Sequence, residues 1–253
     1  MSDLFAGAGY LLRGLRLVRM HGVPRYVIIP LAINTLLFAG ASYLAFDWFG
    51  VLMQHLAHEL PQWLEWLRYV LWALFVAAGL LILYFAFGVL ANLIAAPFNG
   101  LLSARVERLL TGRRPGEDDG ADEGLLRGAW RDIRAQLIQL RYVLLRLALL
   151  GALTWILALI PPVNLLIPFL WFAFGAWMNA LGYVDVPMGN HGIAFPRGRR
   201  IMARHRGLAL GFGSVTTLAG SLPLINFFVI PVAVAGATAM WVERLQDTPG
   251  ARR

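Results

Sequence analysis

The chain has 253 residues, of which 59% are hydrophobic and only 14% charged, a composition that excludes an ordinary soluble domain and indicates an integral membrane protein. It has no cysteine, and none of its 22 Lys-plus-Arg residues is lysine, which excludes disulfides, thiolate metal sites, a P-loop and Schiff-base chemistry. The net charge of +8 favours a lipid bilayer with anionic headgroups, or an anionic solute, over nucleic acid as a partner.

The first predicted element is an amphipathic helix over Leu4–Met20. Arg13, Arg16 and Arg19 recur at every third position on one face of it, and leucines and a valine lie elsewhere around it. The pattern is typical of a helix that lies in the membrane interface, or more simply of the basic flank of the next membrane span. Because the arginines interrupt the stretch where a secretory signal has its apolar core, we expect no cleavable signal.

Two apolar runs, Tyr26–Phe46 and Arg68–Ile94, are each long enough to cross a bilayer as a helix. The connection between them, Asp47–Glu65, has no arginine and contains His55 and His58. These two histidines are spaced so that they could ligate a metal, but an isolated pair is more often a solvated interfacial face. We therefore predict no metal site.

The segment 97–142 is predicted to lie in the cytoplasm as two amphipathic helices, Leu101–Leu110 and Leu125–Tyr142, joined by an acidic loop. The second of these helices leads directly into the membrane at Arg141. An arginine at that depth is a functional candidate. Near a helix end, however, its side chain can simply reach the headgroups.

Two further apolar stretches, 144–183 and 208–242, are each interrupted near the middle. The first break is at Pro161-Pro162 and the second at Ser221-Leu222-Pro223, and neither carries a charge. A turn that emerges into water or headgroups normally has polar residues. We therefore predict two re-entrant helical hairpins, whose tips stay inside the membrane against protein or a water-filled path. Two ordinary spanning pairs with tight turns are the alternative.

Arginine-rich segments precede Tyr26 and cover 97–142 and 185–206, whereas the connection 47–65 has none. By the positive-inside rule this connection is external, and both termini of the multi-pass chain are cytoplasmic. Both hairpins and spanning pairs fit this distribution. The predicted fold is thus an all-α membrane domain over 1–253, with two spans, two re-entrant hairpins and amphipathic cytoplasmic helices.

A candidate anion site lies in the turn before the first span. Pro24 suits the start of a helix, and Gly22 lies in the turn that precedes it. The backbone N–H groups of Arg25 and Tyr26 then have no acceptor within the helix and can bind an anion together with the arginine side chain. The simpler alternative is a helix start with an arginine that reaches the headgroups.

No set of residues typical of an enzyme is present. Asp185 and His191 could form an acid–base pair, but no nucleophile, metal cluster or phosphate-binding loop accompanies them. We therefore predict no catalytic residue and no cofactor. The interrupted helices favour transport that is channel-like or ion-coupled rather than ATP-driven. An accessory or structural membrane protein is the alternative.

Several strings of residues resemble the CysZ family of bacterial sulfate permeases. They are Arg25–Leu31, Ile94–Leu102, Leu170–Phe172, Ala176–Met178, Asn190-His191 and Pro231–Val242. The resemblance covers nearly the whole chain. It implies sulfate uptake across the inner membrane for sulfate assimilation and cysteine biosynthesis, by a homo-oligomer with two spans and two hemi-penetrating hairpins. Sulfite and thiosulfate are alternative substrates.

The resemblance also implies a sulfate-binding turn. The family's turn reads Gly-Leu/Ile-Arg-Arg, and the aligned residues here are Gly22, Val23, Pro24 and Arg25, with Tyr26 next, so one arginine is kept and the other is proline. Further candidates for the anion site or the pore are Arg16, Arg19, Glu107, Arg108 and Arg141.

Small residues recur at intervals of four in the second hairpin, as Ala233 with Ala237 and Ala235 with Ala239. Such spacing lets helix backbones approach closely in lipid. We therefore predict that the homo-oligomer packs partly through this arm.

Overall fold

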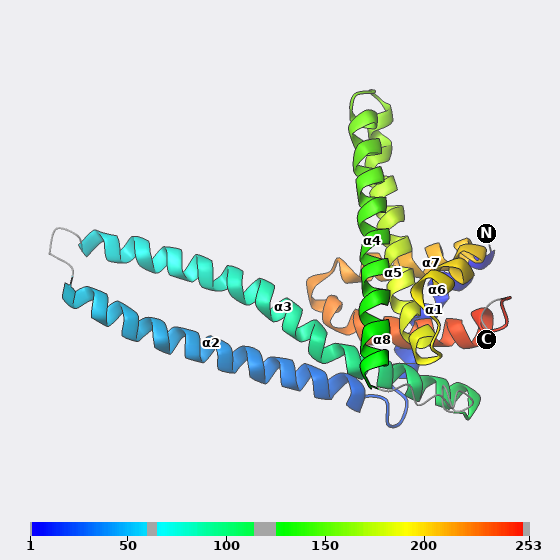
Figure 1. Ribbon diagram of the computed structural model, residues 1–253, viewed down its shortest axis with the longest axis horizontal. Helices are drawn as coiled ribbons and strands as arrows, with labels where there is room; N and C mark the ends of the chain where they lie inside the picture. Colours follow the sequence, from blue (N-terminus) through cyan, green and yellow to red (C-terminus); the bar gives the residue numbers. More distant parts are fainter. Residues whose placement is uncertain (1, 60–64, 114–124, 250–253) are drawn as a thin grey trace. The chain divides into compact units, whose positions relative to one another are not determined.

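The computed structural model describes residues 2–59, 65–113 and 125–249, which are almost entirely helical and contain no strand (Figure 1). The helices are α1 Ser2–Val18, α2 Arg25–Glu59, α3 Glu65–Thr111, α4 Leu125–Ala158, α5 Ile167–Asn190, α6 Phe195–Arg204, α7 Arg206–Gly220 and α8 Pro223–Met240, with short turns η2 Val163–Leu166 and η3 Trp241–Leu245. Four described stretches are long and apolar enough to cross a membrane: Arg25–Val51, Leu137–Ala158, Val163–Asn190 and Phe228–Leu245. The predicted all-α membrane protein is confirmed at this level.

The internal contacts of the chain divide it into two compact units. One is Arg25–Phe98, and the other combines Met1–Pro24 with Asn99–Arg253. The division falls inside α3, which continues through Pro97 although the sequence predicted a helix end at Ile94. Proline removes a single backbone donor, and apolar helices tolerate that loss. Helix α3 therefore continues through the proline.

In the first unit, α2 and the first part of α3 lie side by side (Figure 1). Phe49 is buried between them, with its ring against those of Phe75 and Trp72. Most other described apolar side chains remain exposed, and Leu36 on α2 is 73% exposed. Such a surface indicates contact with lipid. The predicted spans lie within longer helices, and the side chains of His55 and His58 lie outside the described set.

In the second unit, α4 and α5 form a long hairpin (Figure 1). The chain turns at Pro161-Pro162, as predicted, and the Trp171 indole donates a hydrogen bond to Thr154 Oγ1 at 3.0 Å across the pair. With 34 and 24 residues, α4 and α5 measure about 51 and 36 Å. Both exceed the roughly 30 Å of a hydrocarbon core. Helix length alone therefore permits this hairpin either to span the membrane or to enter it at an angle.

The second predicted hairpin consists of α7 and α8, and its break at Ser221-Leu222 is confirmed. Helix α7 has 15 residues and is about 22 Å long, which is too short to cross a hydrocarbon core. Helix α8 is largely enclosed by its own chain from Val229 onward. This pair is therefore the packed centre of the second unit.

Helix α1 packs against α7 and α8. The prediction of an interfacial helix did not include this contact with protein. Glycines bring the backbones together: a Cβ added to Gly211 would clash with the carbonyl oxygen of Leu4, and one added to Gly236 with that of Tyr10. Tyr10, Leu11 and Leu17 are buried on the packed face. The amphipathic pattern was correct, but its apolar face contacts protein.

The same packing corrects the predicted oligomer interface. Ala233, Ala235, Ala237 and Ala239 are all completely buried within the chain. The prediction that a second copy packs on these residues is wrong, because their own chain already covers them. Small residues at this spacing indicate a close helix contact, but the spacing does not show which helix is the partner.

Hydrogen bonds and ion pairs join α1 to Glu243 and Arg244 of η3. Tyr10 donates a hydrogen bond to Glu243 Oε2 at 3.2 Å, and Arg13 donates to the same oxygen at 2.8 Å. Arg244 pairs with Asp3 at 3.0 Å. Burial, together with the neighbouring Glu243 carboxylate, raises the pKa of Tyr10 to about 12. Tyr10 is therefore a neutral donor at physiological pH.

We expect Gly211→Ala to lower stability by about 1–3 kcal/mol, because the added methyl group must push α1 away from α7. Gly9→Ala is the matched control, since a Cβ there meets no atom within 4 Å. Alanine in place of an exposed helical glycine stabilises by about 0.5–1 kcal/mol. Unfolding in mild detergent measures both effects. Equal stability of the two variants would contradict the packing of α1.

Candidate functional site

The turn before α2 has a compact backbone. Gly22 has φ +79°, a conformation that glycine adopts without steric cost, and the Val23 amide donates to the Met20 carbonyl oxygen at 3.1 Å. The Val23 side chain is completely buried. The predicted turn is therefore a fixed structure.

Arg105 of α3 lies against this turn. Its Nη2 is 3.5 Å from the His21 carbonyl oxygen, and a Cβ on Gly22 would lie 3.1 Å from the same nitrogen. The Nε–H of Arg105 is buried and has no hydrogen-bond partner among the described residues. A guanidinium carries five N–H donors in a plane that suits an oxyanion. Glycine at position 22 thus leaves room for a cationic donor group at the turn.

Helix α2 begins at Arg25, directly after Pro24, so the predicted helix start is correct to within one residue. The Arg25 guanidinium donates a hydrogen bond to the Tyr26 hydroxyl at 3.0 Å, and its central carbon lies 4.8 Å from the centre of the Tyr26 ring. The ring therefore orients the guanidinium through a cation–π contact. Arg25 remains exposed and able to bind a solute.

The other predicted arginines are more isolated. Arg16 and Arg19 are exposed at the end of α1, Arg108 in the last turn of α3, and Arg141 on α4. None of these four side chains forms a hydrogen bond or ion pair with another residue that the structure describes. Arg16 lines a surface pocket together with Arg13. The structure gives none of them a defined role at the turn.

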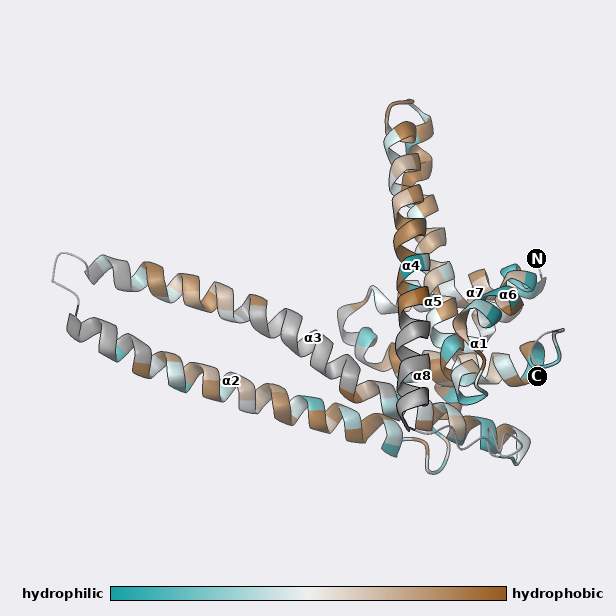
Figure 2. Ribbon diagram, viewed as in Figure 1, coloured by the Kyte–Doolittle hydropathy of each residue, from teal (hydrophilic) through white to brown (hydrophobic). Residues whose placement is uncertain are grey.

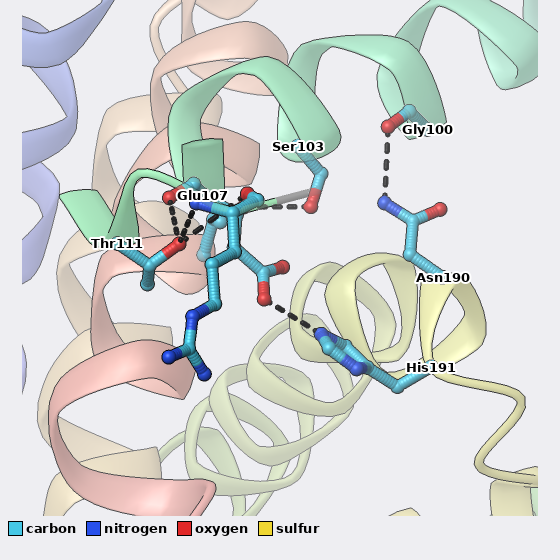
Figure 3. A network of polar contacts seen from close by, with 8 residues as sticks. Gly100, Ser103, Glu107, Thr111, Asn190 and His191 are labelled. Atoms are coloured by element: carbon cyan, nitrogen blue, oxygen red, sulfur yellow. Dashed lines mark hydrogen bonds and ion pairs between the residues drawn. The ribbon is translucent and has the colours of Figure 1, made fainter. Parts of the chain in front are cut away.

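Glu107, by contrast, belongs to a second polar cluster (Figure 3). Its side chain is almost completely buried, and its Oε1 lies 2.7 Å from Nε2 of His191. The other oxygen, Oε2, is also buried and has no partner among the described groups. The imidazole of His191 is 27% exposed and lies against the Trp241 ring. The pair thus connects a buried carboxylate with a partly solvated base.

Hydrogen bonds around this pair join three helices (Figure 3). Asn190 Nδ2 donates to the Gly100 carbonyl oxygen at 3.1 Å and joins the end of α5 to α3. Thr238 of α8 donates to Ser103 Oγ of α3 at 2.9 Å in a fully buried contact. The cluster is therefore held in place by protein on all of its elements.

His191 pairs with Glu107, and this replaces the acid–base pair with Asp185 that the sequence made conceivable. Asp185 lies inside α5, whereas His191 is the capping residue after that helix. The 2.7 Å contact joins the Glu107 carboxylate of α3 to the imidazole that follows α5. In the residues searched, no three His, Cys, Asp or Glu side chains gather to hold a metal ion.

The predicted site lacked several residues of these clusters: Ser103, Arg105, Asn190, His191 and Thr238. Arg105 reaches His21 across 84 positions of sequence, and Glu107 reaches His191 across another 84. No local pattern indicates such contacts. His191 was noted for the resemblance of its string to a family and as a possible partner of Asp185, but not as a partner of Glu107.

Comparison with known protein families matches residues 10–231 to the family described as sulfate transporter CysZ/etoposide-induced protein 2.4. The match includes the Gly22 turn, Arg105, Glu107 and His191, whereas Thr238 and Trp241 of the second cluster lie beyond it. It agrees with the four span-length apolar helices and identifies a membrane protein similar to sulfate transporters. The chain belongs to the sulfate transporter CysZ/etoposide-induced protein 2.4 family.

Proposed function

We propose that this protein carries sulfate across a bacterial inner membrane into the cytoplasm, where the sulfate supplies assimilation and cysteine biosynthesis. It acts as a transporter and not as an enzyme, and it has no lysine for an ATP-binding P-loop. The family match over 10–231 supports this proposal. The observation that carries it is the Arg105 guanidinium, held over a glycine turn with a buried donor that no described residue uses.

Sulfate is a dianion and needs several directed donors to replace its hydration shell. We place it at Gly22–Tyr26, where a helix start provides free backbone N–H groups and Arg25 provides a charged fork. The family's turn has a second arginine where this chain has Pro24. Within the second unit, Arg105 of α3 holds its guanidinium against Gly22 of this turn, and we propose that it is an anion-binding group there.

Movement through the membrane is channel-like or coupled to an ion. Glu107 and His191 form a hydrogen-bonded carboxylate–imidazole pair in the second unit, which also holds Arg105. We propose that the ion-coupled alternative acts through Glu107 and His191. Sulfate uptake that depends on a proton gradient, and loses that dependence in Glu107→Gln, would support coupling. Uptake indifferent to the gradient would contradict it.

For the topology we propose that both termini are cytoplasmic and that both hairpins return to the side they enter from. The short α7 supports this for the second hairpin, because 15 residues do not reach across the hydrocarbon core. The charge-free turn at Pro161-Pro162 supports it for the first. We also propose a homo-oligomer, which a monomeric mass after crosslinking in membranes would contradict.

The absence of cysteine makes this topology directly testable. Asn164 and Ser221 are exposed beside the two turns, so Asn164→Cys and Ser221→Cys each introduce a single thiol. We expect both thiols to resist an impermeant maleimide added outside intact cells, whereas Gln54→Cys, exposed beyond the first span in the predicted external connection, reacts. Rapid external labelling at the two turns would exclude re-entrant hairpins.

The substrate is tested by calorimetry on the purified protein. We expect sulfate to bind more tightly than chloride. Chloride is a singly charged, single-atom ion and lacks the tetrahedral arrangement of acceptor oxygens. Sulfite and thiosulfate are titrated in parallel, and tighter binding of either would identify that anion, and not sulfate, as the substrate. Equal affinity for chloride and sulfate would exclude a specific oxyanion site.

A further inference from the structure

A second basic site lies in the second unit, at the base of the α4–α5 hairpin. A pocket of about 530 Å³ opens there between α4, α5, α6 and the start of α7. Four arginines line it: Arg146, Arg199, Arg200 and Arg206. No acidic residue is among the side chains that line it. A concave site with four positive charges and no negative one attracts an anion.

The arginines are held by an aromatic platform. The guanidinium carbon of Arg199 lies 4.6 Å from the centre of the Tyr142 ring, and that of Arg146 lies 5.4 Å from it. The Trp177 indole donates a hydrogen bond to the Tyr142 hydroxyl at 3.3 Å, and Phe195 packs against the same ring. Two cationic groups on one ring repel each other, and a shared anion removes that repulsion.

The pocket adjoins an apolar surface on one side. Leu145 and Leu149 follow Tyr142 along α4, and both are largely exposed. Figure 2 shows hydrophobic residues along the described parts of α4 and α5 beyond α6, whereas α6 itself is strongly hydrophilic. The aromatic residues Tyr142 and Trp177 lie where these two surfaces meet, as such residues do at a membrane interface.

We propose that this pocket binds the phosphate headgroup of an anionic phospholipid. The arginines contact the phosphate, and the acyl chains lie along the exposed leucines of α4. A free sulfate or phosphate ion shares the charge but gains nothing from the apolar surface beside the pocket. Basic pockets between membrane helices are suited to anionic headgroups for this reason. The proposal does not depend on sulfate being the transported solute.

Lipid affinity tests the proposal. The detergent-purified full-length protein is titrated with phosphatidylglycerol or phosphatidylcholine of identical acyl chains, and native mass spectrometry measures the bound lipid. Inorganic phosphate and sulfate are added as competitors. The test variant is Arg146→Gln/Arg199→Gln. The matched control, Arg108→Gln/Arg141→Gln, removes the same charge from exposed arginines outside the pocket.

We expect phosphatidylglycerol to bind more tightly than phosphatidylcholine. The test variant should bind it about 20- to 30-fold more weakly, since each arginine near an anionic surface contributes about fivefold. The control should retain the affinity of the unmodified protein. Equal binding of the two lipids, equal losses in test and control, or displacement of the lipid by millimolar phosphate or sulfate would each overturn the proposal. If the test variant does not fold, the comparison of phosphatidylglycerol with phosphatidylcholine on the unmodified protein still tests the proposal.

Discussion

Arg25→Ala should weaken sulfate binding by about tenfold to a hundredfold. A charge-assisted hydrogen bond contributes roughly 1.5–3 kcal/mol, and removal of the guanidinium also removes a positive charge from the helix start. The protein should remain folded, because the Arg25 side chain is exposed and contacts only its neighbour Tyr26 among the described residues. Isothermal titration calorimetry measures the affinity, and thermal unfolding checks the fold.

Three further variants show whether a loss of affinity in Arg25→Ala comes from the guanidinium group itself. Arg25→Lys should recover only part of the affinity, because a point charge lacks the planar fork of donors. Arg105→Ala should also weaken binding, because its unused Nε–H donor lies beside Gly22. Arg113→Ala, at an exposed position just beyond α3, controls for the loss of net charge. Unchanged sulfate affinity in a folded Arg25→Ala protein would exclude the site.

The second large effect is expected from His191→Ala. This change leaves the Glu107 carboxylate buried without its one partner, since Oε2 has none among the described residues. Loss of a hydrogen bond to a charged group costs about 1.5–3 kcal/mol. We expect a loss near the lower end of this range, because the imidazole is partly exposed. Reversible unfolding in mixed micelles measures it.

His205→Ala is the matched control for this prediction. His205 is also partly buried, but its Nε2 contacts the neutral Thr248 hydroxyl at 2.9 Å. A hydrogen bond between neutral groups contributes only about 1 kcal/mol. The double variant Glu107→Met/His191→Leu removes both polar partners and should recover much of the stability. If His191→Ala costs no more than His205→Ala, the pair does not stabilise the fold.

Features encoded locally were predicted from the sequence. The two hairpin turns lie in stretches without charged residues, at Pro162 and Pro223. Proline cannot continue a preceding helix without the loss of a hydrogen bond. The start of α2 after Pro24 follows from the same chemistry. Pro97 is the exception, since α3 continues through it in an apolar environment.

Features that depend on a distant partner were missed. The small residues around Gly236 were assigned to a second copy, whereas α1 occupies them in the same chain. The pattern specifies close approach and carries no information about the identity of the neighbour. Arg105 and His191 were missed as site residues because their contacts join positions 84 residues apart.

Uptake of radiolabelled sulfate into liposomes that contain only this protein tests the central claim most directly. We expect saturable uptake that empty liposomes lack, that unlabelled sulfate competes and chloride does not, and that falls in Arg25→Ala. A parallel series with and without an imposed proton gradient distinguishes a coupled carrier from a channel. Sulfate entry no faster than in empty liposomes, with a folded and correctly inserted protein, would contradict the account.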